Sequence, residues 1–368
     1  MKSSAATIRI QSVRVDFSSG VESLNRFARS HFEERPTGAL PQAGQTEIEA
    51  RLEWIEAAPP KMSYAAIAPG KRRPDRDIEI GANEIAWSRI DNFSDLRLRF
   101  VFGERRLQVI GQHFFSLSRV PLRDRIKKAW HRKRLPALRR KRFSTIIYYM
   151  VYYPSFWYLE RRGLFPLHAA AVEVAGTGVV LCGLPGCGKS TLSLALLGLP
   201  GSRLLSDNII FYGKERVFRC PEPVLLDDRS LDLIGSPTSL LRPLGQRHVY
   251  DRSWFHPVPE RVADEAIPRL FFFVGLGHKP SLRALTAQEA YQRFASVNWI
   301  AQEVRRYLVY RSVLGLSTTG HLNSSNGEEP ALEALLRKGQ SYELTVGWGD
   351  GCGPAVEQIH DLCSSMRT

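Results

Sequence analysis

Alternating apolar and polar residues open the chain. In residues 7–17 the apolar side chains fall on every second position, first from Ile8 and then from Val13, which is typical of strands with one buried face. Between Val21 and Phe32 they recur at helical spacing. Further short strands are predicted at Asp77–Ile80, Glu84–Trp87, Leu96–Phe102 and Arg106–Gln112, the last two as a hairpin. The pattern predicts a small α+β module over residues 1–118, with substrate recognition as its suggested role.

From residue 143 onward, short apolar runs alternate with helical segments. Strands are predicted at Ala171–Val174, Val179–Cys182, Ile209–Tyr212, Leu270–Val274 and Tyr342–Val346, and helices at Lys189–Leu197 and Ala287–Tyr310. The order strand, glycine-rich turn, helix, strand is typical of a phosphate-binding βαβ-type unit. This order predicts an α/β domain over residues 143–350, followed by a C-terminal tail at 351–368.

An aromatic stretch begins this second domain. Residues 143–159 are uncharged and rich in tyrosine, but the run is only 17 residues long and contains Pro154. A membrane-spanning helix needs about 20 mostly aliphatic residues. An aromatic helix buried in the core is therefore favoured over a membrane span.

The charge of the protein is concentrated in one segment. The 368 residues carry 51 Lys and Arg against 37 Asp and Glu, a net charge of +14. Residues 119–142 hold twelve Lys or Arg and one acid, Asp124, so this segment contributes +11 and the rest of the chain only +3. We interpret 119–142 as a basic linker or arm. A simply solvated linker is favoured for this segment. The alternatives are binding to an acidic peptide, to a membrane surface or to nucleic acid. Nucleic acid is disfavoured, because Trp130 is the one aromatic residue available for base stacking.

Composition excludes several classes of protein. With 43% hydrophobic and 24% charged residues, the chain is globular rather than disordered. Its five cysteines show no C-x-x-C spacing, which argues against a disulfide framework and the common zinc sites. The first residues contain no apolar run of the kind that forms a signal-peptide core. A cytoplasmic location is therefore expected.

The sharpest chemical feature lies between a predicted strand and a predicted helix. The pattern G-x-x-x-x-G-K-[ST], the phosphate-binding loop or Walker A motif, is matched by Gly183, Leu184, Pro185, Gly186, Cys187, Gly188, Lys189 and Ser190. Its glycines let backbone N–H groups turn toward phosphate oxygens. The helix beginning there, with Thr191 in its first turn, directs its positive end at the same anion. Lys189 is expected to reach the β- and γ-phosphates of ATP, and Ser190 to ligate Mg²⁺.

Three residues in or near the loop are further candidates, each with a structural alternative. His168 lies among small residues, where a histidine is more often part of the packed core. Asp207 follows an apolar pair, in the place of an Mg²⁺-facing carboxylate, with a turn or cap aspartate as the alternative. The helix N-terminus is expected to lower the pKa of Cys187, although a space-filling role is favoured for this side chain.

Taken together, His168, the loop at 183–190 and Asp207 resemble the catalytic domain of HPr kinase/phosphorylase. The resemblance is closest to the HPr-kinase-related kinases of bacterial peptide-modification gene clusters, and phosphoenolpyruvate carboxykinases share the same order of residues. It covers residues 143–350. It implies an α/β, P-loop-containing HPr kinase/phosphoenolpyruvate carboxykinase-like core and leaves a homo-oligomer open.

The resemblance also implies an activity. It indicates an ATP-dependent, serine-kinase-like phosphotransferase that uses Mg²⁺ and phosphorylates a Ser or Thr hydroxyl of a peptide or small protein. A ribosomal peptide precursor is one such acceptor, and a peptide-carrier protein is a further candidate partner. Catalytic roles are implied for Lys189, for His168, which orients the transferring groups, and for Asp207, which with Ser190 holds the metal.

One position departs from the family's pattern. The second of two paired aspartates is replaced by Asn208, and an asparagine cannot act as a base. Glu222, Asp227 or Asp228 could supply the missing carboxylate, although exposed acidic residues are usually only solvated. Two alternatives therefore stay open beside the kinase: a nucleotide-dependent binding module with weak or lost catalysis, and a small-metabolite kinase.

Overall fold

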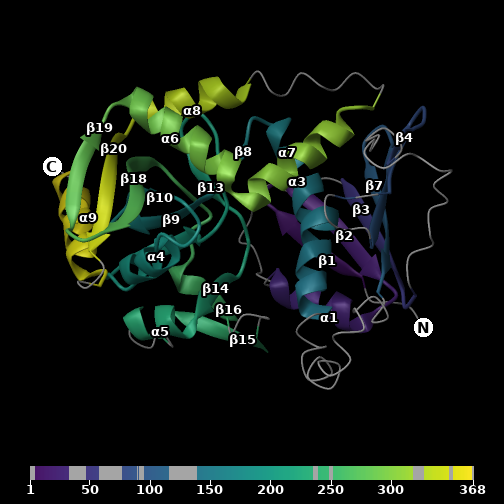
Figure 1. The fold of residues 1–368 in the computed structure, drawn as a ribbon, viewed down its shortest axis with the longest axis horizontal. Coiled ribbons are helices and arrows are strands. Elements are labelled where there is room, and N and C mark those ends of the chain that lie inside the picture. Colours follow the sequence, from purple (N-terminus) through teal and green to yellow (C-terminus); the bar gives the residue numbers. More distant parts are fainter. Residues whose placement is uncertain are drawn as a thin grey trace, which may run out of the picture. The chain divides into compact units, whose positions relative to one another are not determined.

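The protein is a mixed α/β chain that divides into two compact units. Its structure, a computed structural model, describes residues 5–32, 47–57, 77–88, 90, 95–115, 139–234, 239–247, 252–317, 327–347 and 351–366. The first unit comprises Met1–Ser30, Thr37–Trp157 and Leu308–Leu322, and the second His31–Pro36, Tyr158–Tyr307 and Asn323–Thr368. Figure 1 shows the elements of both.

The first unit is built on a seven-stranded sheet in the order β1-β2-β3-β7-β6-β5-β4. Its strands are β1 (Ala6–Ile10), β2 (Val13–Ser19), β3 (Ile48–Ile55), β4 (Ile78–Ile80), β5 (Glu84–Trp87), β6 (Leu96–Phe102) and β7 (Leu107–Phe114), with helix α1 (Glu22–His31) after β2. The alternation of β1 and β2 predicts both strands, and their apolar positions are buried. β3 was not predicted from the sequence; it lies between β2 and β7 and is parallel to both.

A helical segment rich in aromatic residues completes the core of this unit. Residues 139–147 are helical, and a π-helical turn, Tyr148–Tyr152, then leads into α3 (Tyr153–Glu160). Pro154 has no N–H to donate, and the backbone N–H of Tyr153 bonds to Tyr148 five residues back, as in a widened turn. Tyr149 and Tyr153 are buried. No helix within the described residues is long and apolar enough to span a membrane.

The structure describes only the last four residues of the basic segment 119–142. Residues 119–138 lie outside the described residues. Residues 139–142 begin the helical segment, and two of their arginines form ion pairs within the first unit, Arg139 with Glu56 at 2.8 Å and Arg142 with Asp95 at 3.0 Å. At least these two charges therefore serve the first unit rather than a free linker.

The second unit is built on a six-stranded sheet in the order β11-β9-β10-β18-β20-β19. Its strands are β9 (Ala169–Val174), β10 (Thr177–Cys182), β11 (Arg203–Ser206), β18 (Pro268–Gly277), β19 (Ser281–Leu285) and β20 (Gln340–Gly347). β10, β18 and β20 are parallel neighbours, whereas β9 pairs antiparallel with both β10 and β11. The predicted unit from β10 to β11 therefore crosses over one antiparallel strand, and both strands end at the same edge of the sheet.

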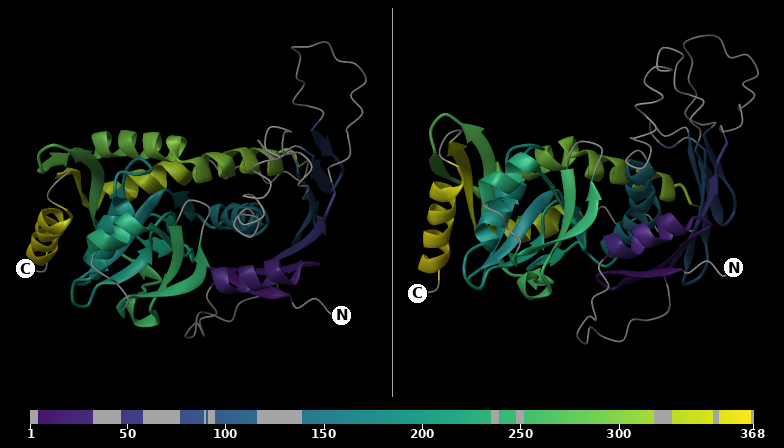
Figure 2. Two further views of the ribbon diagram at one scale, coloured as in Figure 1. Left: turned by 60° about the horizontal axis from the view of Figure 1, so that its bottom comes forward. Right: turned by 90° about the horizontal axis from the view of Figure 1, so that it is seen from below.

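Helices cover both faces of this sheet (Figures 1 and 2). On one face, α4 (Lys189–Leu197) and α9 (Gly353–Ser365) pack on Leu270, Phe272 and Val274 of β18. On the other, α6 (Ala287–Ile300) and α8 (Glu328–Arg337) pack on Phe271 and Phe273. Since successive strand residues point to opposite faces, the apolar run of β18 supplies both cores.

Two smaller sheets belong to the same unit. One has the order β17-β13-β12-β8 and the other β14-β16-β15. Their strands are β8 (Phe165–Leu167), β12 (Ile210–Tyr212), β13 (Val217–Arg219), β14 (Val224–Asp227), β15 (Leu241–Arg247), β16 (Arg252–Pro257) and β17 (Glu265–Ala266), and the short helix α5 (Asp228–Ile234) follows β14. β8 comes directly before β9 in the chain, and β12 follows β11, so both strands adjoin the end of the larger sheet where the candidate residues lie.

The structure differs from the predicted boundaries in three places. Residues 143–157 belong to the first unit, because their aromatic side chains are part of its core. Residues 353–365 form α9, whose Ala355, Ile359 and Cys363 join the core of the second unit, so this segment is not a tail. The helix predicted at 287–310 is two helices, α6 and α7 (Gln302–Leu314), since Ala301 has an extended backbone conformation.

Candidate functional site

The glycine-rich loop connects the end of β10 to the start of α4. Gly183 and Gly188 have positive φ angles of 153° and 91°. A Cβ at Gly183 would lie 2.6 Å from the Val274 carbonyl oxygen, so β18 leaves room only for glycine there. A Cβ at Gly186 or Gly188 would meet open space. The loop is thus anchored at its first residue and open to solvent around the later glycines.

Lys189 is the first residue of α4 and is buried. Its Nζ donates to the carbonyl oxygens of Gly183 at 2.9 Å and Leu184 at 3.1 Å. The ammonium group is therefore stabilised by carbonyl dipoles of its own loop, and no carboxylate of the described residues forms an ion pair with it. An anion entering the loop would meet a buried cation.

Asp207 lies at the carboxyl end of β11, beside the first turns of α4. Its Oδ1 accepts a hydrogen bond from Ser193 Oγ at 3.3 Å, and the hydroxyl of Ser190 also bonds to its carboxylate. Burial raises the pKa of Asp207 to about 6, although the two serines and the charge of Lys189 oppose the shift. The fold has thus placed an acid, two hydroxyls and a cation around one point at the edge of the sheet.

His168 reaches the same edge because β9 runs antiparallel to β10. Ala169 pairs with Cys182, so the residue before β9 stands next to the residue where the loop begins. Burial and the nearby charge of Lys189 lower the pKa of His168 to about 3. Its ring nitrogens make no hydrogen bond of standard geometry within the described residues. The backbone of Asn208 raises the pKa of His168, but less than burial and Lys189 lower it. The imidazole is neutral and buried beside Lys189.

A helix residue that the sequence did not point to fixes the backbone at His168. Asn298 of α6 accepts the His168 N–H through Oδ1 at 2.9 Å, and its Nδ2 donates to the Pro166 carbonyl at 3.4 Å. The link joins residues 130 positions apart. A lone asparagine on a helix carries no sequence signal of such a role.

The three acidic candidates for a second carboxylate lie in two different places in the structure. Asn208 Nδ2 donates to Glu222 Oε2 at 3.1 Å, so Glu222 is brought beside the residue that follows Asp207. Asp227 Oδ1 instead accepts the backbone N–H of Ser230 at 2.8 Å, and Asp228 lies in the first turn of α5. Both aspartates belong to the start of α5, where acidic side chains stabilise a helix.

Cys187 differs from its sequence-based expectation. Its pKa is raised, because burial outweighs the opposing effects of Lys189 and of the loop amides. The side chain is 9% exposed and packs in the core beneath the loop. The expected lowering by the helix N-terminus is therefore wrong, and the space-filling role fits the packing.

The remaining residues of the loop region divide by exposure. Leu184, Pro185 and Gly186 are exposed at the rim, whereas Thr191 is buried in the first turn of α4. Ser193, one turn later, was not singled out from the sequence, although its position three residues after Ser190 puts both hydroxyls on one helix face.

The donor set fits a nucleotide phosphate with Mg²⁺. An anion is suited by the exposed loop backbone, by the open space at two glycines and by the buried Lys189, which forms no ion pair with a carboxylate in the part of the chain that the structure describes. Ser190 and Asp207 offer adjoining oxygen ligands, and Mg²⁺ is usually held by one or two carboxylates together with substrate phosphates. Groups of three or more His, Cys, Asp or Glu side chains that could hold a metal ion are absent from the described residues.

The chain was compared with protein-family models, curated proteins and solved structures. No protein-family model matches it, and no curated protein matches it in sequence. Among solved structures, it is similar to the Hpr(Ser) kinase/phosphatase from Coxiella burnetii, with 13% sequence identity and a TM-score of 0.27 over 55% of this chain and 99% of the other. A TM-score this low gives no information about the site.

Proposed function

We propose that the second unit is an ATP-dependent kinase that phosphorylates a hydroxyl group of a peptide or small protein. One observation carries the proposal: the loop with Lys189 and the Ser190–Asp207 pair meet at the carboxyl edge of one sheet. Ligands of open α/β sheets bind at this edge. A glycine-rich turn that served only the fold would need neither the buried lysine nor the buried acid.

In the proposed reaction, an acceptor hydroxyl oxygen attacks the γ-phosphorus of ATP. The bond from that phosphorus to the β–γ bridging oxygen breaks, and ADP leaves with the electron pair. Lys189 and the loop amides hold the β- and γ-phosphates and offset their charge. Ser190 and Asp207 would hold Mg²⁺, which supplies further charge compensation.

The proton of the acceptor hydroxyl needs a receiving group. Asn208 cannot take it, but its amide holds the carboxylate of Glu222 at 3.1 Å. We therefore propose that the carboxylate of Glu222 accepts this proton and that His168 orients the reacting groups. The contact between Asn208 and Glu222 favours the kinase over a binding module, because it brings a carboxylate to the residue that follows Asp207.

The acceptor class is tested by incubating the full chain with Mg²⁺ and γ-labelled ATP, with and without a set of Ser- and Thr-containing peptides. A kinase of peptides adds one phosphoryl group to a peptide, detected by mass spectrometry. Label transfer to small molecules without peptide would favour a small-metabolite kinase instead. Nucleotide binding with no transfer to any acceptor would leave a binding module and contradict the proposal.

Glu222→Gln is expected to lower the rate of transfer by about 10²-fold or more, the usual contribution of a general base. The glutamine keeps an oxygen that can accept from Asn208, so the loop should keep its position. Single-turnover rates at saturating ATP measure the effect. The matched control is Glu260→Gln, in the exposed turn Pro259–Arg261; an equal rate for Glu222→Gln and the control would remove Glu222 from the mechanism.

A further inference from the structure

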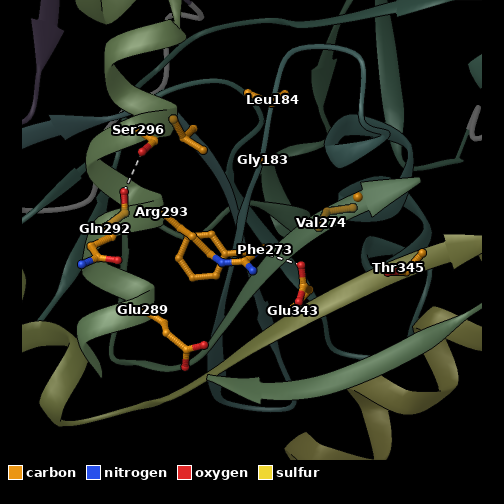
Figure 3. A pocket seen from close by; sticks show the side chains of 12 residues that line it. Gly183, Leu184, Phe273, Val274, Glu289, Gln292, Arg293, Ser296, Glu343 and Thr345 are labelled. Atoms are coloured by element: carbon orange, nitrogen blue, oxygen red, sulfur yellow. Dashed lines mark hydrogen bonds and ion pairs between the residues drawn. The ribbon is translucent and has the colours of Figure 1, made fainter. Parts of the chain in front are cut away.

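A cavity of about 560 Å³ opens next to the first residues of the loop. It lies on the α6 face of the sheet, between α6 and the carboxyl ends of β18 and β20, and Figure 3 shows its lining. Gly183 and Leu184 form its rim toward the loop. Its volume is within the range of about 300–1,000 Å³ typical of small-molecule sites.

The strand order separates this cavity from the residues proposed for catalysis. Asp207 follows β11, and His168 precedes β9, so both lie on one side of β10. The cavity is lined by Val274 and Thr345 of β18 and β20, on the other side of β10. The loop stands between the two. A nucleotide whose γ-phosphate faces Asp207 would therefore extend its other end toward the cavity.

The charges that line the cavity compensate one another. Of the lining residues, Arg293 pairs with Glu343 at 2.8 Å. Arg283, which is not part of the lining, pairs with both lining carboxylates, Glu343 and Glu289, at 3.0 Å. The backbone N–H of Thr286 also donates to the Glu289 carboxylate, as part of a capping box. The one cation among the described lining residues, Arg293, is already paired with a carboxylate, so the cavity is less suited to phosphate than the loop around Lys189. It suits an uncharged, polar group.

Flat and apolar surfaces line the same space. The guanidinium group of Arg293 lies over the ring of Phe273, 6.0 Å from its centroid, and Glu343 holds it from the side (Figure 3). A guanidinium fixed in this way presents a plane on which a nucleobase can stack. Leu184 is 50% exposed at the rim, and Gln292 of α6 adds donors and an acceptor for the edge of a base or for ribose.

We infer that this cavity binds the nucleoside part of the nucleotide, with the base stacked against Arg293 and the ribose toward Leu184. The inference rests on the proposed function, since it assumes that the loop holds the phosphates. It adds a second binding surface, built from α6, β18 and β20, and assigns the affinity for nucleoside to side chains that lie outside the loop motif.

The test compares ATP with inorganic tripolyphosphate, which has the phosphates but no nucleoside. Ser296 is exposed on α6 and lines the cavity, so Ser296→Phe should fill the space without disturbing the core. We expect calorimetry on the full chain with Mg²⁺ to show that this variant binds ATP about tenfold more weakly or worse, the loss of one stacking contact. Its affinity for tripolyphosphate should not change.

The matched control is Ala295→Phe, the neighbouring exposed position of α6 that does not line the cavity; it should bind both ligands like the unaltered protein. Unchanged ATP affinity in Ser296→Phe would overturn the inference and leave the proposed function standing. The same holds if ATP affinity is unchanged and only the KM of an acceptor rises, because the acceptor would then occupy the cavity. An equal loss for both ligands would also overturn it. If the unaltered protein bound neither ligand, the proposed function would fail and the inference with it.

Discussion

Lys189→Ala is expected to lower the kcat/KM of ATP-dependent transfer by about 10³-fold or more, because one cation is removed from the place where phosphate charge develops. The same change should weaken ATP and tripolyphosphate alike, since Lys189 acts on the phosphates. Within the described part of the chain, its ammonium donates to the carbonyls of Gly183 and Leu184. The loss of these two hydrogen bonds should leave the fold intact. Steady-state kinetics will measure the change in kcat/KM, and calorimetry the change in affinity.

The control for this variant is Lys338→Ala. Lys338 is exposed at the end of α8 and pairs with Glu215 at 2.6 Å, and exposed ion pairs contribute only about 0–1 kcal/mol to stability. Its removal tests the loss of a surface charge from the same unit. Full transfer activity in Lys189→Ala, measured beside this control, would show that the loop motif has no catalytic role.

If Asp207 holds Mg²⁺ as proposed, Asp207→Asn is expected to reduce transfer by about 10³-fold, because the substitution removes the negative charge but keeps the shape of the side chain. The amide oxygen can still accept from Ser193, which now donates to Asp207 at 3.3 Å. The variant should therefore fold and retain ATP binding when Mg²⁺ is chelated. With Mg²⁺ present, the gain in ATP affinity that the metal gives the unaltered protein should be lost. Titrations of ATP with and without Mg²⁺ separate the two.

Asp227→Asn provides the matched control, since asparagine also accepts the backbone N–H of Ser230 at the start of α5. Its transfer rate and Mg²⁺ dependence should equal those of the unaltered protein. A variant Asp207→Asn that kept the full Mg²⁺ effect would exclude Asp207 as a metal ligand, whatever its transfer rate.

Local patterns in the sequence predict many individual elements. α4 was predicted with the bounds that the structure has, because a strict loop motif marks its start and Gly198 its end. β1, β2 and β5 follow from alternation of apolar residues. β3 and α9 were not predicted. β3 does alternate, with Ile48 and Leu52 buried and Arg51 and Glu53 exposed, so its pattern was missed rather than absent. α9 buries only Ala355, Ile359 and Cys363, which is a weaker apolar signal. The pattern also merged α6 and α7, since apolar periodicity continues through the break at Ala301.

Local spacing is enough to predict phosphate binding at the loop, because its glycines, Lys189 and Ser190 lie within one short segment. The distant residues that join them could be identified only from the three-dimensional arrangement of the strands. It brings Glu222, and neither Asp227 nor Asp228, to Asn208, ties Asn298 to the backbone of His168, and forms a cavity from three separate elements. Such contacts depend on strand order and on burial, which set the distance between residues far apart in the chain, and no local pattern encodes them.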